Sequence, residues 1–265
     1  MSVPVYPPVE PGFFRLTQSD VNAYLKCGIA YQLRRESKNR HATVRMLVGS
    51  AVAAGAKDDN REKIAQGGGP GVGLNAIIEA SVSAYEAEMA SSDVDATKFE
   101  RDLGKDGAAN AAREYKAGIS PMIREVVAAE EPIIARFGGV EGLELAGTPD
   151  VITPDGVGDL KVGKPWGGDD ADESRQLTAY SILHRAKRGG YPARLWIDNV
   201  ASAKGSWSAG RIHTHRDEKH YAAFLEIMKR VRAGIEAGNF LPAPERAWWC
   251  SAMWCPFFHK QCPVT

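Results

Sequence analysis

Two acids and a lysine stand out in the segment GTPDVITPDGVGDLKVGK, which otherwise reads as two short apolar strands. Asp150 ends the first strand, and Asp159 and Lys161 lie in the second, after a turn at residues 154–156. Neighbouring antiparallel strands lie about 5 Å apart, so the two carboxylates can share one divalent ion. Lys161 follows Asp159 by two residues and therefore points to the same face of its strand. The segment predicts either a metal site or a cross-strand ion pair.

The two interpretations differ in chemistry. Carboxylate oxygens suit Mg²⁺ or Mn²⁺, and the main-chain carbonyl of Leu160 would add a further ligand. The ammonium of Lys161 could then orient an attacking water or stabilise charge on a phosphate. The alternative is an ordinary salt bridge between Lys161 and one of the acids. The spacing of these residues does not decide between them.

The cysteines form a second pattern. Cys250, Cys255 and Cys262 lie close together near the C-terminal end, and Cys27 lies alone near the beginning of the sequence. Free cysteines often behave as small buried hydrophobic residues, but that explains three in so short a stretch poorly. Structural zinc sites usually show more closely spaced cysteine pairs.

Four widely spaced thiolates favour a [4Fe–4S] cluster over zinc, since a cluster is larger than one ion. Aromatic residues around the three late cysteines would shield such a cluster from solvent. A ligand set that includes Cys27 would also fasten the two ends of the chain together, so its loss should destabilise the fold. The aromatic residues are Trp248, Trp249, Trp254, Phe257 and Phe258.

Periodicity and turn residues predict the elements that must position these groups. Thr17 or Ser19 could cap one helix over residues 21–36, and a second helix covers residues 44–65. Residues 74–129 read as two or three helices without chemical motifs. The predicted strands cover 132–137, 140–152, 157–162, 193–200 and 210–215, and further helices cover 174–188 and 218–237.

This order of helices and strands predicts an α/β (α+β) fold in a single domain over residues 1–265. Its parts are N-terminal helices over 16–66, a helical insertion over 74–129, a core over 131–240 and a cysteine-rich tail over 241–265.

Composition excludes few classes of protein. Of the 265 residues, 44% are hydrophobic and 25% are charged, and the formal net charge is zero, so any nucleic-acid surface must be a local patch. The N-terminus lacks the features of a signal peptide, and no apolar run could span a membrane, so we expect a cytoplasmic protein. One basic run stands out, as either a nucleic-acid patch or a solvated helix face: Arg34, Arg35, Lys38, Arg40 and Arg45.

A further motif, QLTAY, places Gln176 and Tyr180 one turn apart on one face of the helix after the second strand. Together with GTPD, GDLKVGK and the cysteine spacing, it makes the sequence resemble the RecB-like branch of the PD-(D/E)XK nuclease superfamily. The iron–sulfur members are the most similar: phage exonucleases, the AddB nuclease domain and CRISPR-adaptation nucleases.

The resemblance implies a restriction-endonuclease-like core, a mixed central sheet flanked by helices, and a metal-dependent deoxyribonuclease that acts, often as an exonuclease, on single-stranded DNA or DNA ends. It implies that Asp150 and Asp159 bind Mg²⁺ or Mn²⁺, that Lys161 is catalytic, and that Gln176 and Tyr180 organise the site. Cys27, Cys250, Cys255 and Cys262 match the cluster ligands, and Glu131 resembles the family's glutamate ahead of GTPD. It also implies a bacterial cell or a phage-infected one, with partner proteins of recombination, repair or CRISPR adaptation.

One position departs from the family pattern. The first long helix of the family reads G-S-A-V-H, and the histidine is a metal ligand, whereas this chain has Ala53 in its place. His41 lies outside that register. The change is consistent with a looser natural site, an engineered knockout, or a non-catalytic DNA-binding or assembly subunit that retains the nuclease fold. We expect the metal site to be weakened.

Overall fold

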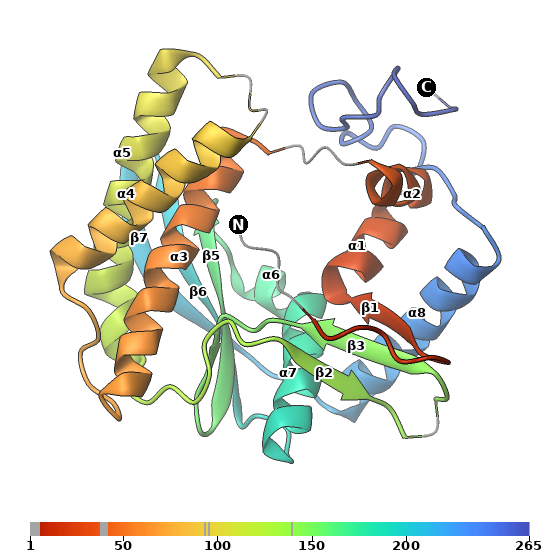
Figure 1. Ribbon diagram of the computed structural model, residues 1–265, viewed down its shortest axis with the longest axis horizontal. Coiled ribbons are helices and arrows are strands. Elements are labelled where there is room, and N and C mark those ends of the chain that lie inside the picture. The colour runs from red at the N-terminus through yellow and green to blue at the C-terminus, as the bar shows by residue number, and fades with distance from the viewer. Residues whose placement is uncertain (1–5, 38–41, 93, 95, 139, 265) are drawn as a thin grey trace.

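The computed structural model describes residues 6–37, 42–92, 94, 96–138 and 140–264 of the chain (Figure 1). Its helices are α1 (Gln18–Lys26), α2 (Gly28–Glu36), α3 (Val44–Ala65), α4 (Leu74–Ser91), α5 (Lys98–Glu114), a π-helical turn (Tyr115–Ile119), a 3₁₀ turn (Ser120–Met122), α6 (Gly168–Asp172), α7 (Arg175–Arg188) and α8 (Glu218–Glu236). Its strands are β1 (Phe14–Thr17), β2 (Ile133–Arg136), β3 (Leu143–Gly147), β4 (Val151–Ile152), β5 (Gly156–Gly163), β6 (Arg194–Ala203) and β7 (Ser206–Thr214).

The strands form two mixed sheets flanked by helices, which confirms the predicted fold class (Figure 1). One sheet has the order β1-β3-β2, with β1 parallel and β2 antiparallel to β3. The other has the order β4-β5-β6-β7, in which only β5 and β6 are parallel. The predicted strand over 140–152 is therefore wrong as one element. It divides into β3 and β4, which belong to different sheets and are joined at residues 148–150.

The two faces of the four-stranded sheet pack against different helices. Along β6, Leu195 and Ile197 pack with residues of α7, whereas Trp196 and Val200 pack with residues of α3 and α5. This alternation is the ordinary period of two in a strand. In the neighbouring β5 it places Asp159 and Lys161 on the face of α7, and Leu160 on the face of α3.

Helix α7 begins and ends as its sequence predicts. The side chain of Ser174 accepts a hydrogen bond from the main-chain N–H of Leu177, and Gly189 ends the helix with a φ of 82°. The glycine of GTPD allows the helix to pack closely, since a Cβ on Gly147 would lie 2.5 Å from Leu183 Cδ1. The middle of α7 is thereby held beside the junction between the two sheets.

The N-terminal helix is the second correction. Thr17 caps α1 through a capping box with Asp20, as predicted, but the expected single helix over 21–36 is broken. Cys27 is extended, with φ −166° and ψ 106°, and separates α1 from α2. Its sulfur accepts a hydrogen bond from the N–H of Ala30 at 3.4 Å and so caps α2. The helical periodicity of the sequence continues across the break and therefore conceals it.

Helices α4 and α5 pack against α3, and α5 also packs against β7. A buried network joins this layer to α3: Asp59 forms ion pairs with Lys63 at 2.8 Å and with Lys116 at 2.7 Å, and Ser120 donates to Asp59 at 2.7 Å. Charges without solvent are costly unless paired, so the network fixes the π-helical turn against α3.

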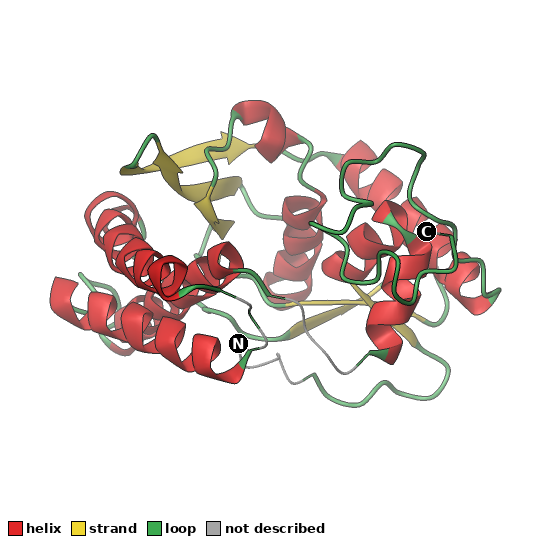
Figure 2. Cartoon of the chain, turned by 90° about the horizontal axis from the view of Figure 1, so that it is seen from above, coloured by secondary structure: helices red, strands yellow, loops and turns green. Residues whose placement is uncertain are grey.

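The tail after α8 contains no regular element in its described part, up to residue 264, as predicted. Its loops, which surround the C-terminus in Figure 2, lie next to α2 in Figure 1. The N–H of Ile29 donates to the carbonyl of Leu241 at 3.3 Å, and the hydroxyl of Tyr24 donates to the carbonyl of Asn239. The two ends of the chain are therefore in contact. Among the described helices, none has the length and apolar character needed to cross a membrane.

Candidate active site

Asp150 and Asp159 lie on the two neighbouring strands of the β4–β5 hairpin. Asp150 directly precedes β4, and Asp159 lies in β5. Val151 pairs with Gly158 and Ile152 with Val157, and extending this register places Asp150 opposite Asp159. Asp150 Oδ2 accepts a hydrogen bond from the N–H of Leu160 at 2.6 Å, which fixes its carboxylate beside the middle of β5. The predicted juxtaposition of the two carboxylates is confirmed.

A chain of hydrogen bonds connects this pair to α7. Lys161 Nζ lies 2.6 Å from Asp159 Oδ2 and donates to Gln176 Oε1 at 2.7 Å. The amide nitrogen of Gln176 donates to Asp159 Oδ1 at 2.8 Å and to the hydroxyl of Tyr180 at 2.9 Å. That hydroxyl donates to the carbonyl of Thr148 at 3.1 Å. Lys161, Gln176 and Tyr180 thus form one connected network. The ion pair between Lys161 and Asp159 is part of this network.

The charges at this site are not balanced. Burial and the charge of Asp159 raise the pKa of Asp150 well above its ordinary value. Burial also raises the pKa of Asp159, and Lys161 opposes this shift without cancelling it. Burial lowers the pKa of Lys161, but the two carboxylates outweigh it and raise that pKa. Two buried carboxylates with one ammonium favour a further cation, so the donor set fits Mg²⁺ or Mn²⁺.

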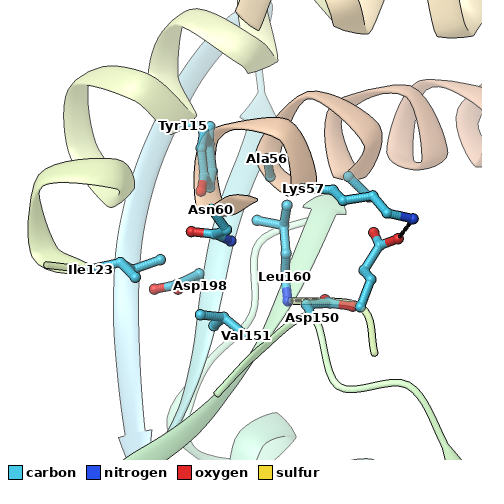
Figure 3. A pocket seen from close by; sticks show the side chains of 11 residues that line it. Ala56, Lys57, Asn60, Tyr115, Ile123, Asp150, Val151, Leu160 and Asp198 are labelled. Atoms are coloured by element: carbon cyan, nitrogen blue, oxygen red, sulfur yellow. Dashed lines mark hydrogen bonds and ion pairs between the residues drawn. The ribbon is translucent and has the colours of Figure 1, made fainter. Parts of the chain in front are cut away.

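Asp150 also lines a pocket that encloses about 300 Å³ of space, part of it open to solvent (Figure 3). Ala53 and Lys57 line it from α3, one helical turn apart, and Leu160 lines it from β5. The position of the missing histidine therefore faces the same pocket as Asp150. The remaining lining residues are Ala56, Asn60, Tyr115, Ile123, Glu130, Val151 and Asp198.

The glutamate in this pocket is Glu130, whereas the sequence comparison selected Glu131. Glu131 forms an ion pair with Lys187 at 2.5 Å and is exposed. Glu130 lies in the left-handed region, with φ 47°, and pairs with Lys57 at 2.5 Å. A non-glycine residue in that region carries backbone strain, which often marks functional sites. The sequence does not show which of the two adjacent glutamates enters the pocket. Both precede β2, which begins at Ile133, so no strand alternation fixes the direction of their side chains.

Sequence reasoning also missed Asp198. Asp198 is an acid within the largely apolar strand β6. An acid in an apolar strand is also the feature that drew attention to Asp159, so the sequence could have indicated Asp198. Its carboxylate accepts two hydrogen bonds from Arg211, at 2.7 and 2.9 Å, and one from Trp196 at 2.8 Å. Asp198 is therefore paired with an arginine, whereas the hydrogen bond that Asp150 accepts comes from the main-chain N–H of Leu160.

The four cysteines converge although their positions in the sequence are far apart. Cys27, Cys250, Cys255 and Cys262 line one pocket of about 290 Å³, part of it open to solvent. Burial, together with the neighbouring thiols of the other three, raises the pKa of Cys250. Among the described residues, no three His, Cys, Asp or Glu side chains are grouped closely enough to hold a metal ion between them.

The aromatic residues around these cysteines divide into two groups. Phe257 and Phe258 line the cysteine pocket, as expected of shielding residues. Trp248 and Trp254 do not; they are 64% and 56% exposed. The prediction that the tryptophans shield the cysteines is therefore wrong for these two.

The basic run is only partly described. Arg34 and Arg35 lie at the end of α2 and Arg45 lies near the start of α3. Lys38 and Arg40 lie outside the described residues, as does His41.

Comparisons with known proteins address the fold. The sequence model described as "PD-(D/E)XK nuclease superfamily" matches residues 15–263. No curated protein matches the chain. Among solved structures, a protein from Eubacterium rectale described as a proposed exonuclease is 13% identical, with a TM-score of 0.55 over 90% of this chain and 86% of that one. The structure of SSO0001 is 15% identical over 93% of this chain and 95% of that one, but its TM-score of 0.32 is too low to indicate a common fold.

Proposed function

The chain belongs to the PD-(D/E)XK nuclease superfamily, and from that premise we propose that it is a metal-dependent DNA nuclease. The observation that supports this most directly is the pair of opposed carboxylates, Asp150 and Asp159, which lie beside Lys161 and an open pocket. An exonuclease that acts on single strands or DNA ends is consistent with the family and with the description of the Eubacterium rectale protein.

The divalent ion would be held by Asp150, Asp159 and the carbonyl of Leu160, and Glu130 lies in the same pocket. When bound, such an ion supplies positive charge to the scissile phosphate and lowers the pKa of the attacking water. The residues of the chain hold its ligands in place. The N–H of Leu160 fixes one oxygen of Asp150, and the amide of Gln176 fixes one oxygen of Asp159.

Lys161 remains protonated because the two carboxylates raise its pKa. It therefore acts as an electrostatic group that stabilises charge on the phosphate, rather than as a base. Gln176 accepts from Lys161 and donates to Asp159, so it sets the distance between the ammonium and the carboxylate. Tyr180 anchors Gln176 to the junction between the sheets through Thr148.

We further propose that Cys27, Cys250, Cys255 and Cys262 hold a [4Fe–4S] cluster. Zn–S bonds of about 2.3 Å require the four sulfur atoms to surround one ion closely, whereas the larger cluster binds sulfur atoms that lie further apart. The shared cavity and the lining by Phe257 and Phe258 support this proposal. The cluster would serve the fold, since it joins the start of α2 to the tail. A role in recombination, repair or CRISPR adaptation is compatible with such a nuclease.

The nuclease proposal predicts degradation of end-labelled DNA in the presence of Mg²⁺ or Mn²⁺. We expect cleavage of both single-stranded and double-stranded substrates, and we expect no products when EDTA is present. The Asp159→Ala variant should lower the rate by about 10³-fold, since it removes a ligand whose charge contribution is several kcal/mol. Asp172→Ala, on the exposed end of α6, is the matched control and should retain activity.

Ala53 supports a second candidate function, a non-catalytic DNA-binding or assembly subunit. Wild-type protein that binds labelled DNA but releases no products with Mg²⁺, Mn²⁺ or Co²⁺ would establish this alternative. Cleavage that Asp159→Ala does not reduce would instead indicate a contaminating nuclease.

Restoring the histidine at Ala53 should strengthen the metal site. Because Ala53 faces the same pocket as Asp150, Ala53→His should raise Mn²⁺ affinity and Mn²⁺-dependent cleavage by about tenfold or more. Titration calorimetry with MnCl₂ measures the first effect, and digestion of labelled DNA measures the second. Ala54→His, one residue further along α3, does not line the pocket and should change neither. Equal affinities for wild type and Ala53→His would show that this position is not a ligand.

A further inference from the structure

The tail presents an aromatic surface beside the cysteine pocket. The ring of Trp248 contacts Trp249 and Trp254 edge to face, with centroids 5.6 and 5.2 Å apart. Trp248 and Trp254 are 64% and 56% exposed, and the adjacent Met253 is 82% exposed. Large exposed aromatic groups that support one another in this way usually mark an interaction site. We refer to Trp248, Trp249 and Trp254 as the tryptophan cluster.

A cation belongs to the same surface. Lys26 Nζ, at the end of α1, lies 5.8 Å from the ring centroid of Trp248 and 5.3 Å from that of Trp249. Arg246 and Lys260 are exposed in the same tail, against one acid, Glu245. Indole faces combined with positive charge fit a polyanion that carries flat aromatic groups.

The tryptophan cluster is close to the active site along α1. Thr17, which caps α1, pairs with Ala146 of β3, so the start of α1 borders the GTPD segment. Lys26 follows Asp20 by six residues, which corresponds to about 9 Å along the helix. A few nucleotides of a single strand can bridge such a distance.

We propose that the tryptophan cluster and Lys26 form a stacking platform for unpaired nucleotides of single-stranded DNA on their way to or from Asp150. This inference rests on the proposed function and names the form of its substrate. Bases in a duplex are already stacked and cannot lie on the indole rings, so the platform selects single strands.

Binding of fluorescein-labelled oligothymidine, measured by fluorescence anisotropy in EDTA, tests the platform. The Trp248→Ala/Trp254→Ala variant should weaken this binding by about 10- to 100-fold, and its affinity for a blunt duplex of equal length should change by less than about threefold. Trp248→Phe/Trp254→Phe keeps the aromatic faces and should retain most of the affinity. Met253→Ala removes an even more exposed apolar side chain from the same loop and should have no effect.

Two outcomes would overturn the platform: unchanged oligothymidine binding, or equal losses on single strand and duplex. Circular dichroism checks the fold, and the single variant Trp254→Ala provides the same comparison if the double variant is unfolded. Hydrolysis of bis(4-nitrophenyl) phosphate, which is too small to reach the platform, should be equal in wild type and variant. If the wild type does not hydrolyse this compound, the proposed nuclease activity is contradicted. The binding comparison between single strand and duplex still tests the platform.

Discussion

Replacing Asp150 by asparagine should abolish DNA cleavage and, at the same time, stabilise the metal-free protein at neutral and alkaline pH. The loss of cleavage, about 10³-fold or more, follows from the loss of an anionic ligand. The gain in stability follows from the charges, since burial and Asp159 raise the pKa of Asp150 well above its ordinary value. The amide oxygen of asparagine can still accept from the N–H of Leu160, so the main chain remains supported.

The sign of the pH dependence follows from that raised pKa. A carboxyl group whose pKa is higher in the folded than in the unfolded protein contributes stability below about pH 4, and this contribution is lost as the pH rises through the folded pKa. Thermal unfolding in EDTA should therefore show the wild type falling below Asp150→Asn as the pH increases. Added MnCl₂ should reverse the order, because only the wild type gains from binding.

Asp155→Asn is the matched control for this experiment. Asp155 lies in the turn of the same hairpin, and its hydrogen bond with Arg194 lowers its pKa, so its contribution to stability has the opposite sign. This variant should retain cleavage and gain no stability at alkaline pH. An Asp150→Asn protein that is less stable than wild type in EDTA at alkaline pH would contradict the raised pKa of Asp150.

The second large effect concerns the cysteines. Cys27→Ser should remove the absorbance near 400 nm of anaerobically purified protein and lower the unfolding midpoint by about 10 °C, because cluster binding contributes to folding. Substituting any one of Cys250, Cys255 and Cys262 should have a similar effect, since all four line one pocket. The expected loss is in stability first and in cleavage only as a consequence.

Met253→Ser controls for a polar substitution in the same exposed loop and should keep both absorbance and midpoint. Metal analysis separates the alternatives. One zinc per chain without visible absorbance would replace the cluster by a zinc site. Protein that contains neither metal and unfolds at the same temperature as Cys27→Ser would show that the thiols are simply buried side chains.

The sequence predicted those parts of the site in which local geometry decides the outcome. Asp150, Asp159 and Lys161 come together because one short hairpin fixes their register. Gln176 and Tyr180 follow because they lie one turn apart on a helix with clear capping residues. Each of these relations spans only a few residues, or one helix beside its preceding strand.

The remaining features depend on packing between distant segments. The break at Cys27 interrupts a continuous helical pattern, and nothing in the neighbouring residues requires it. Glu130 enters the pocket because of a left-handed backbone conformation, which two successive glutamates do not reveal. Trp248 and Trp254 were expected to shield the cysteines because they flank them in the sequence, but they are exposed and contact each other edge to face.

The contact between the tail and the first two helices also determines the order in which the protein can be completed. Tyr24 and Asn239 are 215 residues apart in the chain, and the contact between Ile29 and Leu241 is of similar range. On the ribosome, α1 and α2 must therefore wait without their partner until almost all the rest has been synthesised. Contacts of such long range form slowly and leave apolar surface exposed meanwhile. The tail is therefore the last segment to pack onto α1 and α2, and the apolar surface that it covers stays exposed until then.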